Sequence, residues 1–341
     1  METAKKNHTS DVVDASNPKL LSTKKRPTVF LFFAFLFIFV GYLLTAQNLV
    51  HFGVMKTSLT HELPRVRHIA ILTVTFFRLA MFLLGICFGL IFLFWKKIYS
   101  LNLIQTILKH QPIYPRTTFT VKTIFNRSFF IILALACASL LFILYSPYLS
   151  NTISDKIMKE DGIAEWLTAL TFLFCSVIAA ANIFISPRIQ YKITFLLFSL
   201  LFFLCFGEEI SWGQRIFGFA SPEAIKNINA QEEFNLHNSF GYLADHLFFI
   251  AIFSYGCVMP LLSLTHEFWH RLFDKLGIPI ASAGLAIGFF ISLLFYDPIF
   301  FFFFHQWAFR IAEIRELLIS ASLLILLFEA RNFFATIQPS H

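Results

Sequence analysis

Three glutamates lie at the ends of long apolar runs, where a carboxylate is costly to place. Glu165 is near the start of the run 163–185, and Glu208 and Glu209 directly follow the charge-free run 193–207. A carboxylate at the centre of a bilayer costs about 2.5–3.5 kcal/mol on insertion scales, and less near the interface. If the two runs are consecutive membrane-spanning helices, all three carboxylates reach the same boundary. We expect them to line a shared recess as catalytic residues, with Glu208 or Glu209 as general acid or base and Glu165 in an orienting or metal-binding role.

The residues that follow this pair extend the candidate site. If the helix continues past Glu209, then Glu208, Trp212 and Arg215 share one face at i, i+4 and i+7, and Arg215 can pair with Glu208. We expect Trp212, Gln214 and Arg215 to contact a substrate. The alternative interpretation is a helix end whose charges face water. The doubled glutamate next to fifteen uncharged residues favours the recess.

A polar stretch further along supplies a histidine to the same membrane face. His237 lies in the string QEEFNLHN (231–238), and histidine with carboxylate ligands suits zinc or another divalent transition metal. We expect His237 to be a metal ligand with Glu208, or a proton shuttle, although no HExxH-like spacing is present. His266 and His270 have helical spacing but fall on the other side of the membrane, where we expect a solvated loop.

The elements that position these residues are membrane helices. The chain of 341 residues is 57% hydrophobic and 14% charged, with 47 phenylalanines, whereas soluble domains are about 25% charged. A bilayer calls for about 20 apolar residues per helix. The apolar runs are 28–46, 69–95, 128–148, 163–185, 193–207, 247–264, 276–296 and 317–328. The sequence therefore predicts an all-α polytopic transmembrane bundle of about eight helices.

Basic residues set the expected orientation. Eight crossings place the segment 96–127 on the same side as both termini. That segment contains no acidic residue and carries Lys96, Lys97, Lys109, Arg116, Lys122 and Arg127. Cations accumulate on the cytoplasmic side, so we expect both termini in the cytoplasm. The net charge of +7 is thus a topology signal, and its expected partners are membrane lipids rather than nucleic acid.

The chain divides by composition into a tail and a membrane domain. Residues 1–26 are polar and charged, and we expect a disordered cytoplasmic tail. Residues 27–336 form the transmembrane helical domain, which includes the basic cytoplasmic loop 96–127 and the outer loop 208–246. Two pairs of glycines at helical spacing, Gly85/Gly89 and Gly284/Gly288, predict close helix packing.

Three strings resemble segments of a group of bacterial multi-pass membrane proteins that has no assigned activity. They are EDGIAEWLTAL (160–170), GEEISWGQRIFG (207–218) and EEFNLHN (232–238). The resemblance covers about residues 160–330 and leaves the residues before 160 unmatched. It implies a bacterial inner (plasma) membrane location and directs attention to Glu165, Glu208, Glu209, Trp212, Gln214 and His237, but it implies no mechanism.

Three functions remain open from the sequence. The first is a membrane-embedded hydrolase or transferase that acts at the outer face on a lipid or a lipid-linked sugar, with Glu208, Glu209, Glu165 and His237 as catalytic residues. The second is a proton- or ion-coupled transporter, since intramembrane carboxylates serve in proton relays. Transporters usually bind their substrate near the bilayer midplane, which counts against it. The third is a non-catalytic membrane component that assists assembly or binds a partner.

Overall fold

The described part of the chain consists of helices joined by turns and loops. A computed structural model describes residues 28–53, 56–62, 64–145, 162–223, 242–296 and 311–337, and within these ranges there is no strand. The described residues form two compact units, one within 28–48 and 74–104 and the other within 49–73 and 105–337. Among the described residues, five helical segments are long and apolar enough to cross a membrane. They are Ala70–Leu93, Arg127–Tyr145, Ile163–Ile185, Ile189–Glu209 and His246–Thr265.

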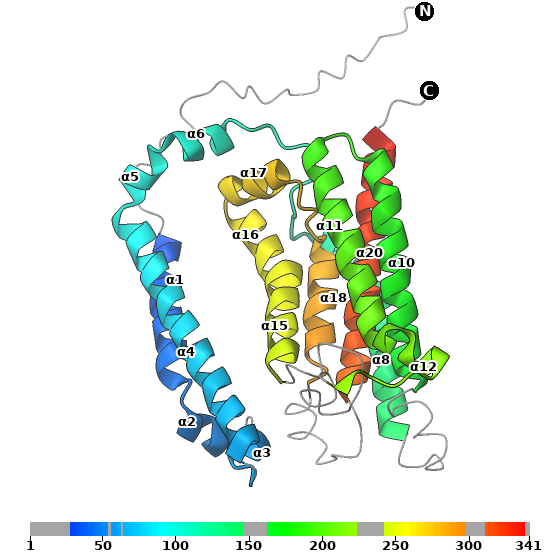
Figure 1. The fold of residues 1–341 in the computed structure, drawn as a ribbon. Coiled ribbons are helices and arrows are strands. Elements are labelled where there is room, and N and C mark those ends of the chain that lie inside the picture. The colour runs from blue at the N-terminus through cyan, green and yellow to red at the C-terminus, as the bar shows by residue number, and fades with distance from the viewer. Residues whose placement is uncertain are drawn as a thin grey trace, which may run out of the picture. The chain divides into compact units, whose positions relative to one another are not determined.

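The first unit is a pair of apolar helices, α1 (Thr28–Leu43) and the greater part of α4 (Pro64–Leu93), followed by α5 (Trp95–Tyr99) (Figure 1). The Phe88 ring contacts three phenylalanines of α1, including Phe37 with ring centroids 5.5 Å apart. A Cβ added to Gly85 would lie 2.6 Å from Ile38 Cγ1. The missing side chain therefore allows the close approach of the two helices, as the glycine pair predicted.

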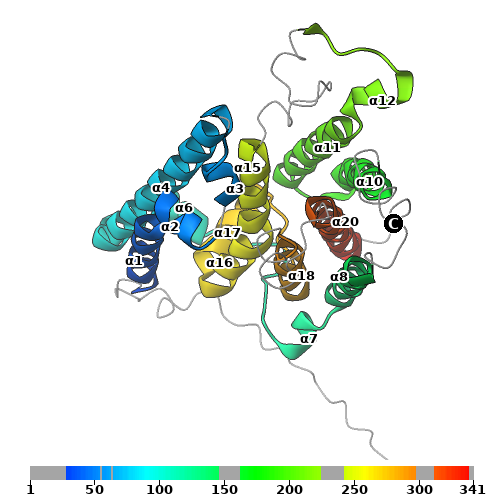
Figure 2. The same cartoon turned by 90° about the horizontal axis from the view of Figure 1, so that it is seen from below.

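The second unit is a helix bundle. Its long elements are α8 (Arg127–Tyr145), α10 (Ile163–Ile185), α11 (Ile189–Glu209), α15 (Tyr242–Phe253), α16 (Met259–Thr265), α18 (Ala283–Leu293) and α20 (Ile311–Ile337). In Figure 2 α10 lies beside both α11 and α20, while α18 packs against α20 and α8. The shorter elements of the chain are α2 (Ala46–His51), α3 (Lys56–Leu59), α6 (Asn102–Leu108), α7 (Val121–Ile124), η3 (Ser211–Gly213), α12 (Gln214–Phe217) and α17 (Glu267–Leu276).

Buried polar contacts join the helices of this bundle. The Ser176 hydroxyl donates to the carbonyl of Ser199 at 2.9 Å, which connects α10 to α11. The Asn182 amide of α10 donates to the Leu327 carbonyl of α20 at 3.0 Å. Where lipid surrounds a bundle, such hydrogen bonds and close packing hold helices together because apolar burial between helices gains little.

Proline explains the irregular turn between α15 and α16. Pro260 follows a π-helical turn, Ser254–Val258 (η4). A proline ring collides with the carbonyl four residues earlier and supplies no N–H. The wider turn lets the helix pass this position without ending, as π-bulges commonly do.

The run 276–296 is helical over only part of its predicted length. Gly277 ends α17 with φ of 73°, and α18 begins only at Ala283, after Ser282 caps it by accepting from Leu285 N at 3.3 Å. A Cβ on Gly277 would lie 2.3 Å from the Gln190 backbone, so close packing against α11 fixes this break. Membrane-length helices thus support the polytopic prediction, while eight crossings and the cytoplasmic termini stay predictions.

Candidate functional site

The helix that carries the glutamate pair ends at Glu209. Three consecutive residues then adopt positive φ, with 46° at Ser211, 52° at Trp212 and 84° at Gly213. The conformation suits glycine but is uncommon for serine and tryptophan. The helix does not continue through Arg215, because a left-handed turn separates α11 from the short α12, so the shared face of Glu208, Trp212 and Arg215 that a continued helix would give is not formed.

Trp212 nevertheless reaches Glu208. Its indole Nε1–H donates to Glu208 Oε1 at 2.8 Å. The indole ring lies on Gly207, where an added Cβ would be 2.9 Å from the ring carbon Cζ3. The left-handed turn, and not a continued helix, therefore brings Trp212 to Glu208.

Glu165 and Glu209 come from different helices and line one pocket. The other lining residues are Trp166, Ala169 and Ile210, and the pocket is a shallow depression without an enclosed space for a water molecule; its empty volume of about 170 Å³ includes the part open to solvent. Glu165 is in the first turn of α10 and Glu209 is the last residue of α11. The structure therefore brings together two of the predicted carboxylates at one end of the bundle.

Helical periodicity explains why Glu209 faces α10. Phe195, Phe202 and Glu209 are spaced at i, i+7 and i+14, and both phenylalanines are buried. Phe202 stacks with Phe172 of α10 at a centroid distance of 6.3 Å. Residues seven apart share a helix face, so Glu209 extends the apolar stripe that packs on α10.

The start of α20 adds further charges near this end. The Cys205 thiol of α11 lies within electrostatic range of Glu209, Glu208 and Glu316. Arg315, next to Glu316, is 2% exposed and lies over the rings of Phe249 and Tyr296, with centroids 6.0 Å and 5.9 Å away. Arg315 is absent from the candidate residues of the sequence, but a signal for it exists. A cation beside the apolar run 317–328 is as costly to place in a membrane as a carboxylate.

The structure describes only some of the other predicted site residues. The Ser221 hydroxyl donates to Gln214 Oε1 at 3.2 Å, and Arg215 belongs to α12. His237 lies outside the described residues. Among the residues that the structure does describe, no three His, Cys, Asp or Glu side chains gather as a metal site. The metal prediction rests on His237 with Glu208 and stays a prediction.

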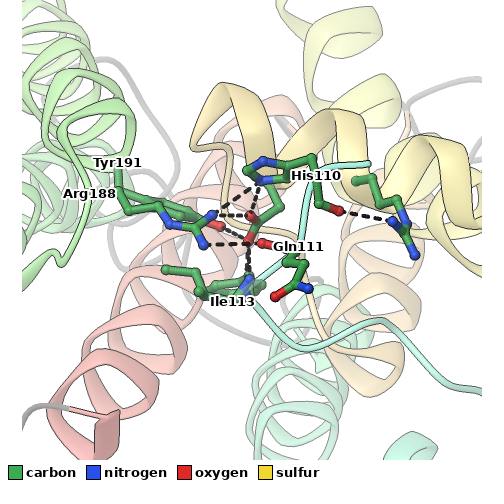
Figure 3. A network of polar contacts seen from close by, with 8 residues as sticks. His110, Gln111, Ile113, Arg188 and Tyr191 are labelled. Carbon is green, nitrogen blue, oxygen red and sulfur yellow. Dashed lines mark hydrogen bonds and ion pairs between the residues drawn. The ribbon is translucent and has the colours of Figure 1, made fainter. Parts of the chain in front are cut away.

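A second polar cluster lies at the opposite end of the bundle, around Asp274 of α17 (Figures 1 and 3). Asp274 Oδ1 accepts from the backbone N–H groups of Ile113 and Tyr114 at 3.0 and 2.8 Å, and from the Tyr191 hydroxyl at 2.7 Å. Oδ2 lies 2.7 Å from His110 Nε2 and 2.9 Å from Arg188 Nη1. We call these five groups and the carboxylate the Asp274 cluster.

Hydrogen bonding affects the pKa of Asp274 more than burial does. Burial alone would raise the pKa of Asp274, but the donors of Tyr114, Tyr191, His110 and Ile113 hold the pKa below its usual value of 3.8. A carboxylate that accepts several hydrogen bonds is stabilised in its charged form. With five donors the acceptor capacity is nearly filled, which indicates a structural role in holding residues 110–114 against α11 and α17 rather than a catalytic one.

Two arginines also attach the 108–116 segment to α16 and α17, through hydrogen bonds to backbone carbonyls. Arg271 donates to the carbonyls of Leu108 and His110, and Arg116 donates to those of Ser263 and Leu264 at 2.8 and 2.7 Å. The basic loop is therefore fastened to α16 and α17 through its own arginine and through one from α17.

The two histidines of this region differ from their predicted solvated state. His270 is 5% exposed within α17, and His266 caps that helix by accepting from Phe268 N at 3.0 Å. Burial lowers the pKa of each histidine. The prediction of a solvated loop is wrong, because residues 267–276 form a helix that lies across the end of the bundle and buries one face.

Comparisons with known proteins add no identification. No protein-family model matches the chain, and neither a curated protein nor a solved structure matches it. The fold is that of a helical, membrane-type protein, with Glu165 and Glu209 together at one end of its bundle.

Proposed function

We propose that this chain is a multi-pass protein of a bacterial inner membrane and an enzyme whose outer-face site transfers protons to and from a lipid or lipid-linked sugar. One observation carries the proposal: Glu165 of α10 and Glu209 of α11 line the same pocket. Both residues end apolar helices of membrane-spanning length. Their carboxylates would therefore lie at the level where lipid headgroups meet water, which suits a substrate with one apolar and one polar part.

Two carboxyl groups in one pocket suit general acid–base chemistry. One ionised and one protonated carboxyl can accept and return a proton as a bond at the substrate breaks or forms. Arg315 of α20 is buried and lies 4.0 Å from Glu316, so this end of the bundle also holds a cation. His237 and a divalent metal remain part of the proposal only as additional ligands with Glu208.

The test compares variants of the pocket with a matched control. The full-length protein and its Glu165→Gln and Glu209→Gln variants are overproduced, and membrane lipids and lipid-linked saccharides are measured by mass spectrometry. We expect the wild type to change the abundance of a defined species, and the variants to lose roughly 100-fold or more of that activity, as for a removed acid or base. Glu223→Gln, an exposed acid after α12, should behave as the wild type. Unchanged activity in both pocket variants contradicts the proposal.

A proton- or ion-coupled transporter is the second candidate, and a different observation favours it. Ser320, Ser322 and Asn182 are fully buried along α20 and α10, and Asn182 Oδ1 has no hydrogen-bond partner. Polar atoms inside a membrane bundle often mark an ion pathway. Proton flux in proteoliposomes that is lost in Asn182→Leu, with lipid composition unchanged, would favour this function over the first.

A further inference from the structure

The acids at the end of the bundle that holds the Asp274 cluster are engaged inside the protein. Among the residues that the structure describes there, the acids are Asp274, Glu267 and Glu329. Asp274 accepts from five donors. Glu267 pairs with Arg271 at 2.6 Å, and Glu329 accepts from the Ser282 hydroxyl at 2.7 Å. These carboxylates therefore do not neutralise the other cations of this end.

The cations of this end fall into two groups. Arg116, Arg188 and Arg271 donate to backbone carbonyls or to the buried carboxylate. Lys192 and Lys275 are half-buried, and no ion pair joins either of them to a carboxylate in the part of the chain that the structure describes. The arginines thus hold the protein together, while the charges of the two lysines are not balanced within these residues.

Both lysines flank the contact between α11 and α17. The Thr194 hydroxyl of α11 donates to the Leu276 carbonyl of α17 at 3.3 Å. A Cβ on Gly277 would lie 2.3 Å from the backbone of α11, so the two helices meet closely there. Lys192 is two residues before Thr194, and Lys275 directly precedes Leu276. The two cations therefore belong to one place, which we call the α11–α17 junction.

An exposed apolar stripe continues from this junction along α11. Leu196 and Leu200 follow Lys192 at i+4 and i+8 on the same helix face, and both are exposed. The face of α11 toward α10 is buried instead. Leu276, next to Lys275, is also exposed. Because α11 is long and apolar enough to cross a membrane, we expect acyl chains along this stripe.

We propose that the α11–α17 junction binds the headgroup of an anionic phospholipid in the leaflet at this end, with an acyl chain along α11. Two ammonium groups complement the negative charge of such a headgroup. The apolar stripe favours a lipid over an acidic protein or a nucleic acid, because neither of these covers exposed leucines along a membrane-length helix. Lys192 is in the first turn of α11 and Glu209 is its last residue, so the lipid site is separate from the proposed reaction.

Lipid binding to the purified full chain in neutral detergent tests the proposal. Native mass spectrometry measures the dissociation constants of phosphatidylglycerol, which is anionic, and of phosphatidylcholine, which has no net charge. We expect phosphatidylglycerol to bind more tightly. In Lys192→Gln/Lys275→Gln its dissociation constant should rise roughly thirtyfold, as expected for two cations near an anionic surface, while that of phosphatidylcholine stays unchanged.

Lys96→Gln/Lys97→Gln is the matched control. It removes the same charge from exposed lysines of α5, in the first unit, and should bind phosphatidylglycerol as the wild type does. Thermal unfolding in the same detergent verifies that the variants fold. If the double variant at the junction does not fold, the single variants Lys192→Gln and Lys275→Gln replace it, and each should weaken binding roughly fivefold.

Three outcomes would overturn the proposal. Equal weakening in the control would show that net charge, and not the junction, attracts the lipid. Equal affinity for phosphatidylcholine would show that the lysines do not recognise an anionic headgroup. If inorganic phosphate binds as tightly as phosphatidylglycerol, the acyl chain contributes nothing and the ligand is a free anion rather than a lipid.

Discussion

The Tyr191 hydroxyl of α11 donates to Asp274 Oδ1 of α17 at 2.7 Å, on the same carboxylate that Arg188 and His110 contact through its other oxygen. This arrangement ties one end of a long helix to a helix that lies across the bundle. The stability of that end therefore depends on one carboxylate, and its removal gives a direct test.

Asp274→Asn should destabilise the second unit strongly. The new amide cannot accept from both groups at Oδ2, and loss of one member of a buried charge pair costs about 3–5 kcal/mol. Reversible unfolding in mixed detergent micelles measures the difference. Glu267→Gln is the control, because Glu267 pairs with Arg271 while its side chain is 54% exposed, and such pairs contribute about 1 kcal/mol or less. Equal stability of both variants would show that the Asp274 cluster is not an anchor.

The buried histidines should make stability depend on pH. Burial lowers the pKa of His270 and of His266 below 6.5. The unfolded state therefore binds more protons, so their contribution is fully present above pH 6.5 and declines as the pH falls, by at most about 1.4 kcal/mol per pH unit for each group.

Melting temperatures between pH 7.5 and 5.0 measure this dependence, and His270→Gln should flatten it. Asp274 contributes to stability over a wider pH range. Because its pKa is held below 3.8, its contribution is present above pH 3.8 and is lost only under more acidic conditions. A profile for His270→Gln that matches the wild type would contradict the assignment to His270.

Gly284→Ala should loosen the contact of α18 with the segment before α8. A Cβ there would lie 2.3 Å from Asn126 Oδ1 and 2.4 Å from the Ile124 carbonyl. Overpacking of this kind costs about 1–3 kcal/mol. Gly89→Ala is the matched control, since its Cβ would have no atom nearer than 3.9 Å, and alanine favours helix by up to about 1 kcal/mol. The melting temperature should therefore fall in Gly284→Ala and stay the same or rise in Gly89→Ala.

The expected orientation can be tested by labelling of introduced cysteines. In a variant whose five native cysteines are replaced by serine, Lys122→Cys should resist a membrane-impermeant maleimide in intact spheroplasts, and Glu223→Cys should react. The positive-inside rule predicts this difference because the segment 96–127 is basic. The reverse pattern would move the Glu165 and Glu209 pocket to the cytoplasmic face and contradict the proposed function.

Much of the fold was predictable because lipid leaves the backbone few choices. Each long apolar run must satisfy its own hydrogen bonds and therefore forms helix. The meeting of Glu165 and Glu209 followed from two consecutive antiparallel helices with acids at adjoining ends. The sequence also indicated the tight glycine contacts, since small residues at helical spacing permit close approach.

The turn after Glu209 and the Asp274 cluster could not be predicted in the same way. Neither Ser211 nor Trp212 favours a left-handed backbone, so only the space over Gly207 explains the turn. The donors to Asp274 include two backbone N–H groups about 160 positions away in sequence. Any residue except proline can supply a backbone donor, so no sequence motif predicts that these N–H groups bind Asp274.

The long sequence separation within the Asp274 cluster constrains how the protein is made. His110 leaves the ribosome 164 residues before Asp274. At a translation speed of about 5–20 residues per second, the wait is roughly ten to thirty seconds. During that interval α8, α10 and α11 are already synthesised, while the 110–114 segment lacks its acceptor. The contacts of the Asp274 cluster therefore form late, after the preceding helices have been synthesised. Nascent chains stalled before α17 should be open to proteolysis at residues 110–114.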